Sequence, residues 1–412
     1  TPKQHTKKVQ VMPRNRRQQQ DEAVLSDPST AHALGDQFSS EPLLPTPELI
    51  TIPTPATLPS GFTVRKAITD HSSTEQTQID DTDHLEVEGS ELKGFWERLW
   101  GTMLACIVVH YIYWSLPLYA LLGYLVYIGY WYVSVLLVLC YLPSFLSGAQ
   151  LKRGRPWDAL RRCRWFWGPV LRYNSLRVVR THRLDPECRY VFALAPHNIL
   201  VLSRVACYAG LFETLFPGIR FRVLGATPMF YAPGCRELCL WLSAVDARRS
   251  VAERLLSEGF SLQIYPEGTR GIFLTDPDSS TTRLYLSRRK GFIRLALRQR
   301  AQVVPCVVLG EKYVYRRAHF SESVKRFFYE KFSMPMLLFW GRFGTLLPLP
   351  GHMTVVYGKP IEVDLDSLAP GEEPSDELVH RVHVEYMRET ARLYRTYQKQ
   401  HPSTYDETLV IE

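Results

Sequence analysis

The positions of hydrophobic and polar residues divide the chain into three parts. Residues 1 to about 90 are rich in Pro, Ser, Thr and Gln and show neither helical nor strand periodicity. Residues 99–151 contain no Asp, Glu, Lys or Arg. Beyond residue 185, short apolar runs alternate with amphipathic stretches, which predicts strands separated by helices.

The first part predicts a disordered N-terminal arm over residues 1–92. Prolines recur through residues 42–59, and proline interrupts both helices and central strands. Too few apolar residues are available to offset the entropy lost on folding. The composition does not distinguish a regulatory role of this arm from a targeting role.

The second part, residues 93–150, predicts a helical hairpin in a membrane. As one helix, residues 99–151 would reach roughly 80 Å, whereas the hydrocarbon core of a bilayer is about 30 Å thick. Two crossings are therefore predicted, near Leu99–Leu116 and Leu118–Leu142, with the turn at Pro117. A re-entrant hairpin gives the same topology and stays an alternative, as does a buried hairpin of a soluble protein.

A basic block, Lys152 to Arg183, follows the hairpin directly. Basic residues beside a membrane segment favour the cytoplasmic side and contact with anionic lipid head groups. Both termini and the rest of the chain are therefore predicted to face the cytosol. Tryptophans and arginines between Trp157 and Tyr173 fit an element in the head-group plane. The net charge of +8 does not indicate a nucleic-acid partner, because no recognition-helix or aromatic–basic strand pattern accompanies it.

The third part, residues 151–412, predicts one α/β domain with a central mixed sheet flanked by helices. Strands and helices that alternate at these lengths are typical of a mainly parallel or mixed sheet. The expected strands are Tyr190–Leu194, Arg220–Leu224, Ser261–Tyr265, Val303–Leu309 and Met353–Tyr357. The expected helices are Leu200–Phe216, Arg236–Ser243, Ser250–Ser257, Lys290–Arg298 and Asp376–Tyr397.

A short loop after the first of these strands carries the first candidate chemistry. It reads Ala195-Pro196-His197-Asn198. A neutral His197 imidazole can take a proton from an alcohol, and amides around Asn198, at the start of an expected helix, can hold an oxyanion. Pro196 makes the approach rigid. The plainer alternative is a structural or solvated histidine.

The loop Pro266–Gly271 follows another expected strand and complements the first. Gly268 permits close approach of the backbone, and Arg270 and the loop amides can donate to a phosphate or a polarised oxygen. Glu267 either orients an imidazole or binds a glycerol hydroxyl. The plainer alternative is a tight turn with a solvated ion pair.

A third, basic loop offers anion binding. Arg289 and Lys290 precede an expected helix and are candidates for the phosphates of coenzyme A. Lys290, Arg294 and Arg298 fall on one helix face, and for Arg294 and Arg298 we favour an ordinary solvent-facing role. The eight cysteines form neither a CxxC pair nor a zinc-ligand pattern, so free thiols and no metal site are predicted.

Several of these segments together resemble the type-2 diacylglycerol acyltransferase family, which also contains monoacylglycerol and wax-alcohol acyltransferases. The resemblance implies an acyltransferase domain over residues 151–412 at the cytosolic face of the endoplasmic reticulum, or at lipid droplets. It implies transfer of a fatty acyl group from acyl-CoA to the hydroxyl of diacylglycerol, which makes triacylglycerol without a further cofactor. Glu311 stands inside a matching segment and is assigned to substrate binding, as are Pro196 and the loop residues Gly268, Thr269 and Arg270. The matching segments are Tyr190–Asn198, Phe216–Arg220, Ser287–Leu297, Val303–Pro305, Gly310–Tyr315 and Gly358–Ile361.

The chain departs from the family pattern at both loops. The His-Pro-His-Gly signature of the family reads Ala195-Pro196-His197-Asn198 here, so that only its second histidine is kept. The family's Pro-Gly-Gly loop reads Pro266-Glu267-Gly268, and its later acidic residue is Gly271. Residues 266–270 instead resemble the Pro-Glu-Gly-Thr-Arg loop of lysophosphatidate and glycerol-phosphate acyltransferases, but the Asp that those enzymes carry five residues after the histidine is Leu202.

These departures leave the acceptor open. Diacylglycerol is the prediction, and monoacylglycerol, a wax alcohol and lysophosphatidate are the alternatives, as is a non-catalytic, lipid-binding membrane scaffold. The oligomeric state is also open, a homo-oligomer included. In every catalytic version the His197 ring lies beside the Glu267–Arg270 turn at the membrane rim. A separation above about 15 Å, or a ring packed deep among side chains, would contradict that mechanism.

Overall fold

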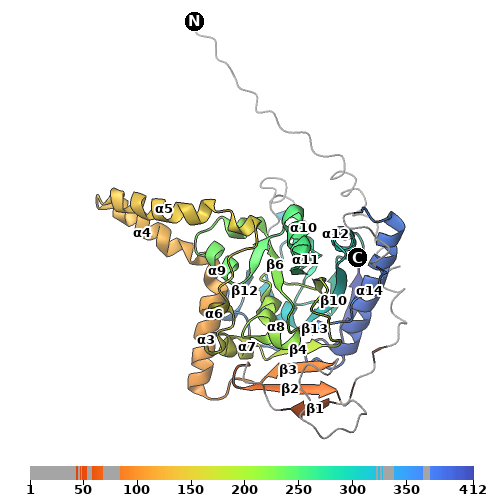
Figure 1. The fold of residues 1–412 in the computed structure, drawn as a ribbon. Coiled ribbons are helices and arrows are strands. Elements are labelled where there is room, and N and C mark those ends of the chain that lie inside the picture. Colours follow the sequence, from red (N-terminus) through yellow and green to blue (C-terminus); the bar gives the residue numbers. More distant parts are fainter. Residues whose placement is uncertain are drawn as a thin grey trace.

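The computed structural model describes residues 43–44, 47, 49–52, 58–67, 84–321, 323–324, 327, 338–364 and 372–412. Within them lies a mixed sheet with the strand order β1-β2-β3-β4-β13-β10-β5-β8-β6-β7, flanked by helices (Figure 1). Strands β10, β5, β8, β6 and β7 run parallel, and β13 turns antiparallel against β10. The predicted central mixed sheet with flanking helices is confirmed.

The strands of this sheet are β1 (Leu49–Ile52), β2 (Phe62–Ala67), β3 (Leu85–Gly89), β4 (Leu176–Arg180), β5 (Tyr190–Ala195), β6 (Phe221–Gly225), β7 (Ala244–Asp246), β8 (Ser261–Ile264), β10 (Gln302–Leu309) and β13 (Met353–Tyr357). Two small sheets pair β9 (Thr281–Leu284) with β14 (Thr408–Ile411) and β11 (Arg316–Arg317) with β12 (Phe339–Trp340).

The α-helices are α3 (Phe95–Val109), α4 (Ser115–Tyr127), α5 (Trp131–Leu146), α6 (Asp158–Arg161), α7 (Arg164–Tyr173), α8 (Leu211–Leu215), α9 (Cys235–Trp241), α10 (Arg249–Ser257), α11 (Thr269–Leu274), α12 (Gly291–Arg298) and α14 (Asp376–Gln398). Short 3₁₀ turns are η3 (His110–Tyr113), η4 (Ala149–Leu151), η5 (Leu202–Cys207), η6 (Thr227–Phe230), η7 (Glu311–Val314) and η8 (Arg342–Gly344).

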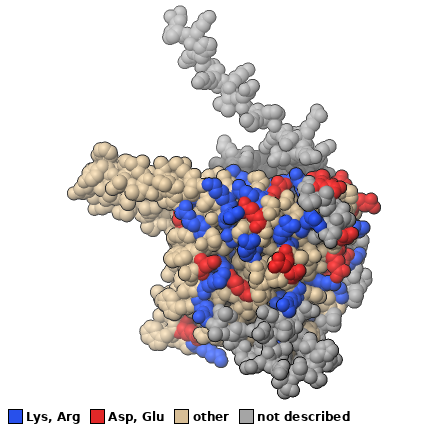
Figure 2. Space-filling view, viewed as in Figure 1, with Lys and Arg blue, Asp and Glu red and all other residues tan. Residues whose placement is uncertain are grey.

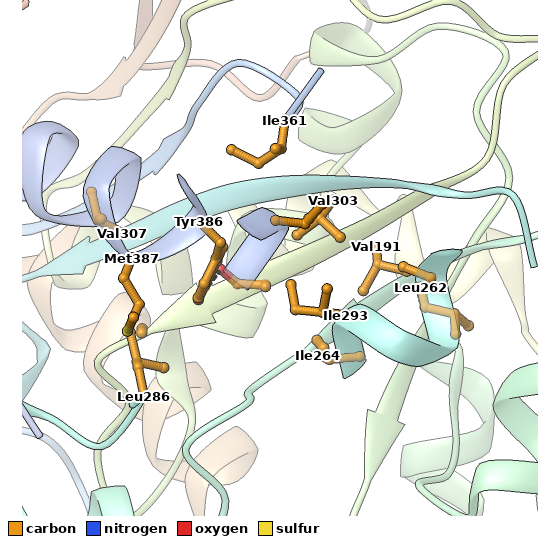
Figure 3. Packing of buried hydrophobic residues seen from close by; sticks show 14 of the residues in the cluster. Val191, Leu262, Ile264, Leu286, Ile293, Val303, Val307, Ile361, Tyr386 and Met387 are labelled. Atoms are coloured by element: carbon orange, nitrogen blue, oxygen red, sulfur yellow. Dashed lines mark hydrogen bonds between the residues drawn. The ribbon is translucent and has the colours of Figure 1, made fainter. Parts of the chain in front are cut away.

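The two faces of the sheet build two hydrophobic cores. Strand β5 is apolar throughout because its residues alternate between them: Val191 faces one core and Phe192 the other. Helices α10, α12 and α14 cover the first face, where Val191 and Val303 lie near Ile293 of α12 and Tyr386 of α14 (Figure 3). Helices α3, α7 and α8 cover the second. Both faces being covered, the central strands are held rigidly, and so are the loops at their ends.

The structure corrects the prediction of a disordered arm up to residue 92. Strands β2 and β3 pair with each other and join β4, and Val64, Leu85 and Val87 are fully buried. Glu86 is also buried and accepts a hydrogen bond of 2.7 Å from Arg177 of β4. Short strand-like alternation inside a polar segment was the missed signal, since pairing with β4 adds the stability that composition alone does not provide. Residues 1–42 lie outside the described residues.

The first predicted crossing, Leu99–Leu116, does not form as one straight helix; in length and composition the bent pair Phe95–Tyr113 and Ser115–Tyr127 is a broken span or a re-entrant loop. Helix α3 packs against α7 through Gly101, Leu104 and Ala105, which are buried. Small residues four apart let the two helices approach closely, and a Cβ on Gly101 would lie 3.3 Å from the Pro169 carbonyl oxygen of α7. The segment Phe95–Tyr113 meets Ser115–Tyr127 at an angle of 58°, so the predicted turn is a bend that precedes Pro117.

Helices α4 and α5 form a hairpin that projects from the rest of the molecule (Figure 1). Its side chains are largely exposed and apolar, and the projection carries neither blue nor red atoms in Figure 2. In length and composition, Trp131–Leu151 is one segment that could cross a membrane. Arg236 of α9 anchors the hairpin, because its fully buried guanidinium donates to the Ser144 carbonyl at 2.9 Å and to Gln150 at 3.2 Å.

The structure also replaces the long helix expected over Leu200–Phe216. Only η5 and the short α8 form there, separated by Ala209 and Gly210, both with positive φ. Positive φ is incompatible with a continuous right-handed helix, so the chain turns at this point. The loop after β5 therefore has no α-helix at its start, and its shape depends on side-chain hydrogen bonds.

Candidate active site

Three neighbouring parallel strands deliver three functional candidates to one edge of the sheet. His197 follows β5, Glu267 follows β8, and Glu311 follows β10. Strands β10 and β8 flank β5, and both pair with it in parallel. The carboxyl ends of parallel strands share an edge, which is where α/β proteins commonly place their sites. The convergence expected from the sequence therefore has a simple topological cause.

His197 and Glu267 form a buried pair. The His197 Nδ1 lies 3.3 Å from Glu267 Oε2, and the same oxygen accepts the His197 backbone N–H at 3.1 Å. A proton on Nδ1, held by the carboxylate, leaves the lone pair on Nε2 free to act as a base. The predicted neighbourhood of histidine and turn is thus present in the structure.

The expectation of an imidazole at an open rim is wrong: the distance to the turn is short, but the ring is packed among side chains, which is the outcome named above as contradicting the mechanism. Only 5% of His197 is exposed, and Glu267 is 0% exposed. The Tyr265 ring lies 5.5 Å from the imidazole, and Gly271 lies so close that a Cβ there would stand 3.0 Å from His197 Cε1. The ring is enclosed because the turn folds directly over it. In this conformation the enclosure limits the access of an acceptor hydroxyl as well as that of water, so His197 can act as a base only if the turn opens.

The remaining contact of Glu267 decides between its two predicted roles. Its Oε1 accepts the Tyr285 backbone N–H at 3.0 Å, so that both carboxylate oxygens are occupied by the protein. A fully buried carboxylate with three internal donors does not reach an acceptor hydroxyl. Of the two predicted roles, orientation of the imidazole fits this geometry, and binding of glycerol does not.

Asn198 shapes the loop with its side chain. Its Nδ2 donates to the Glu311 carbonyl at 2.8 Å, and its Oδ1 accepts the Ile199 N–H at 2.7 Å. Pro196, which precedes His197, is half-buried. The Gly268 N–H, a predicted oxyanion donor, instead donates to the Tyr265 carbonyl at 3.2 Å. Gly268 has a φ of 59°, the left-handed conformation that a side chain disfavours.

Glu311 braces the same loop from the other side. Its Oε1 accepts the Leu202 N–H at 2.6 Å, and its Oε2 is buried without a hydrogen-bond partner. Burial raises the pKa of Glu311 to about 7. This carboxyl therefore faces the loop that carries His197, and not an open substrate cleft as its assignment to substrate binding would require.

The basic residues predicted for anion binding separate into two groups. Arg270 donates to the Tyr285 hydroxyl at 2.6 Å, and Arg289 donates to the Glu267 carbonyl at 2.7 Å, so both lie beside the histidine pair. Lys290 lies apart, 3.2 Å from His380 of α14. Thr269 is exposed at the start of α11. As expected of a solvent-facing residue, Arg294 pairs with acidic residues; Glu373 is 3.0 Å away.

Sequence reasoning missed Tyr285, which contacts Glu267 and Arg270 and follows the unpredicted strand β9. It noted Gly271 only as a departure from a family pattern. A Cβ there would lie 2.7 Å from the Glu267 Cβ, so glycine is what lets Glu267 and His197 meet. Glycine in the place of an acidic residue was the available signal.

One group in the described part of the chain has the geometry to hold a metal ion. Asp276, Asp278 and His319 place ligand atoms within 4.8 Å of one another. They lie on the surface, in and beyond the loop after α11, and Thr275 in this loop donates to the His197 carbonyl at 3.2 Å. They touch neither His197 nor Glu267, so they take no part in the chemistry considered below.

A model of the family described as "Diacylglycerol acyltransferase" matches residues 124–412. The chain belongs to this family. The match covers every residue of the buried site, and with it the chain is an acyl-CoA-dependent O-acyltransferase. The resemblance predicted from the loops is confirmed.

Curated relatives differ in the acceptor that their names print. Diacylglycerol O-acyltransferase 1 of Schizosaccharomyces pombe is 29% identical over 289 residues, 65% of this chain and 78% of the relative. Diacylglycerol O-acyltransferase 2 of Danio rerio is 27% identical, over 71% of this chain and 82% of its own. Human 2-acylglycerol O-acyltransferase 3 is also 27% identical, over 69% of this chain and 85% of its own length.

A solved structure is similar in part. The 1-acyl-sn-glycerophosphate acyltransferase PlsC of Thermotoga maritima matches 50% of this chain and 67% of its own, with a TM-score of 0.30 and 15% sequence identity.

Proposed function

We propose that this family member transfers a fatty acyl group from acyl-CoA to the free hydroxyl of diacylglycerol and so makes triacylglycerol. The observation that carries the proposal is the buried pair of His197 and Glu267, in which the carboxylate occupies Nδ1 at 3.3 Å and leaves Nε2 as the base. Diacylglycerol is favoured as acceptor because it is the substrate printed in the names of several relatives.

The reaction needs one proton carrier and no covalent enzyme intermediate. The Nε2 of His197 takes the proton of the acceptor hydroxyl while that oxygen attacks the thioester carbonyl. When the tetrahedral intermediate collapses, the C–S bond breaks, and the imidazolium returns the proton to the coenzyme A thiolate. Glu267 stabilises the imidazolium and holds the ring in place.

A hydrophobic acceptor is supported by the position of the catalytic loop. Leu202 and Val205 of η5 pack against residues of α3 and α7 around a small apolar cavity of about 20 Å³, which has room for about one water molecule and not for a glyceride, so only the apolar character of this surface supports the proposal. Helix α3 continues through the bend into the exposed apolar hairpin. A neutral glyceride dissolved in a bilayer would thus meet the apolar surface of α3 beside the loop that carries His197.

The hairpin is the proposed membrane anchor, of the re-entrant kind. Helix α4 has 13 residues, about 20 Å at 1.5 Å per residue, which is short of the roughly 30 Å of a bilayer core. Helix α3 is held by α7, so it does not lengthen that crossing. We place the hairpin in the cytosolic leaflet of the endoplasmic reticulum or of a lipid droplet, with residues 151–412 as the catalytic domain and both termini in the cytosol.

Substitution of His197 tests the chemistry. Microsomes that contain H197A should make no labelled triacylglycerol from oleoyl-CoA and diacylglycerol, since general-base catalysis contributes about 10²- to 10⁴-fold. H319A is the matched control, because His319 is a surface histidine outside the pair. Undiminished turnover by H197A at equal expression would refute the mechanism.

Acceptor competition tests the substrate. Diacylglycerol, monoacylglycerol, a long-chain alcohol and lysophosphatidate should be offered together to the purified enzyme, and diacylglycerol should give the highest kcat/KM. Preference for another acceptor would refute the assignment of diacylglycerol while leaving His197 as base. Failure of the wild type to acylate any acceptor would favour the scaffold.

A further inference from the structure

Tyr285 lies between the histidine pair and two arginines, and the proposed reaction gives it no role. It follows β9 directly, and β9 is fixed by parallel pairing with β14 near the C-terminus. Its backbone N–H donates to Glu267 Oε1 at 3.0 Å, which ties it to the carboxylate that orients His197. Its side chain contacts Arg270 and Arg289, so Tyr285 links the histidine pair to these two arginines.

That second feature is a pair of arginines around the Tyr285 side chain. The Arg270 guanidinium donates to the Tyr285 hydroxyl at 2.6 Å, and its Cζ lies 5.1 Å from the ring centroid. The Cζ of Arg289 lies 5.0 Å from the same centroid. Both distances are in the range of cation–π attraction, so the ring holds two cations that repel each other.

Neither of these arginines has a counter-ion in the described part of the chain. The contacts of Arg270 and Arg289 are a hydroxyl and a carbonyl, and no carboxylate lies within 4.0 Å of either. The Arg289 Nε is buried without a hydrogen-bond partner, and burial, with Arg270 nearby, lowers the pKa of Arg289. By contrast, Arg298 on the next helix lies 3.5 Å from Glu253. A half-buried cation with one unused donor beside a second cation is stabilised when an anion joins the two.

The backbone at Gly268 lies close to one of the two arginines. A Cβ on Gly268 would lie 3.4 Å from Arg289 Nη2, and Gly268 has a φ of 59°, so a side chain is disfavoured there. Guanidinium groups bind phosphate through paired, charge-assisted hydrogen bonds, which fits the two neighbouring guanidinium groups of Arg270 and Arg289.

We propose that Tyr285 is a positioning and specificity-determining residue that holds Arg270 and Arg289 as a clamp for one phosphate ester group of a substrate. The inference rests on the proposed function, because it assumes acyl transfer at His197. The phosphate has two sources, coenzyme A or a phosphorylated glyceride acceptor. In either case the clamp lies beside Glu267, so the phosphate group would be held next to the residue that orients the base.

The contribution of the clamp to substrate binding is measured by comparing the KM of substrates with and without the phosphate group. On the donor side, oleoyl-CoA, oleoyl-phosphopantetheine and oleoyl-pantetheine are compared with diacylglycerol as acceptor. On the acceptor side, lysophosphatidate is compared with monoacylglycerol at fixed oleoyl-CoA. In the wild type, loss of the phosphate should raise KM by about tenfold on one side only, and that side identifies the source.

The variant Y285F keeps the ring and the backbone N–H but loses the acceptor for Arg270. It should reduce the discrimination between phosphorylated and unphosphorylated substrate by about fivefold, with kcat at saturation within about twofold of the wild type. R270Q and R289Q should abolish the discrimination. R298Q, which removes the same charge from a neighbouring helix, should leave it unchanged.

Two results would overturn the clamp. One is a wild type that does not discriminate on either side; the other is a Y285F variant with the discrimination of the wild type. Activity of H197A with oleoyl-pantetheine separates this failure from a failure of the proposed function, since an active H197A refutes acyl transfer by His197. An inactive H197A, together with unchanged discrimination in Y285F, refutes only the clamp.

Discussion

The substitution E267Q tests whether the buried carboxylate orients the base. Glu267 accepts the His197 N–H at 3.1 Å, the His197 Nδ1–H at 3.3 Å and the Tyr285 N–H at 3.0 Å. Glutamine has one acceptor oxygen and one NH₂ group. If its oxygen faces Tyr285, the NH₂ faces both donors of His197; if it is flipped, Tyr285 loses its acceptor and the ring loses its negative partner.

The magnitude follows from the bond that is lost. A hydrogen bond to a charged group contributes about 1.5–3 kcal/mol, and if that is lost in the transition state, kcat falls by about 10- to 150-fold. The KM for both substrates should stay within about twofold, because Glu267 is 0% exposed and does not reach a substrate. Initial rates at saturating oleoyl-CoA and acceptor, normalised to folded enzyme, provide the measurement.

The variant E407Q supplies the control for general damage. Glu407 is also a buried carboxylate, and it accepts from Thr282 at 2.6 Å and pairs with Lys312 at 2.9 Å, away from His197. Its replacement should lower the melting temperature without lowering the kcat of the folded fraction. The argument for orientation is refuted if E267Q keeps the wild-type kcat, or if E407Q loses as much kcat as E267Q does.

Three further predictions concern stability. Burial raises the pKa of Glu311 from 4.5 to about 7, so the free energy of unfolding falls as the pH rises from 4.5 to 7. E311Q should therefore flatten the plot of melting temperature against pH in this range. An unchanged slope would contradict the prediction. Burial lowers the pKa of His383 and His401 from 6.5 to about 4, so stability is lost as the pH falls below 6.5; H401Q should lose less between pH 7 and 5 than the wild type. R236M removes the buried donor at the end of α5 and should lower the free energy of unfolding by about 3–5 kcal/mol. Limited proteolysis should then cut the segment between α5 and α9 faster than in the control R249M, whose arginine is exposed.

The buried parallel strands were predictable because they are apolar on both faces. β5, β8, β10 and β13 lie within a residue or two of their expected ranges, since continuous apolar runs of this length have few other structures open to them. β4 was missed because Arg177 and Arg180 interrupt its pattern. The structure explains both residues: Arg177 pairs with Glu86, and Arg180 is buried and donates to the Leu215 carbonyl.

The position of Tyr285 in the site could not be predicted from the pattern of hydrophobic and polar residues along the chain. Its position depends on the pairing of β9 with β14, and Thr281 lies opposite Thr408 in that ladder. Neither strand has a marked hydrophobic alternation, and the partners are far apart in sequence. Register between distant short strands is set by tertiary packing, and only the folded chain shows it.

The residues that differ from the family motifs, Glu267 and Gly271, contact each other and His197 in the structure. The buried carboxylate beside the imidazole comes from the turn after β8, and not from the loop that carries His197. Glu267 supplies it from the neighbouring parallel strand, and Gly271 makes the approach possible, because any Cβ would stand 2.7 Å from Glu267. Glu311 accepts the Leu202 N–H at 2.6 Å and so fixes the loop beyond His197. The contacts of Glu267, Gly271 and Glu311 therefore act on one loop, and together they fix the place of His197.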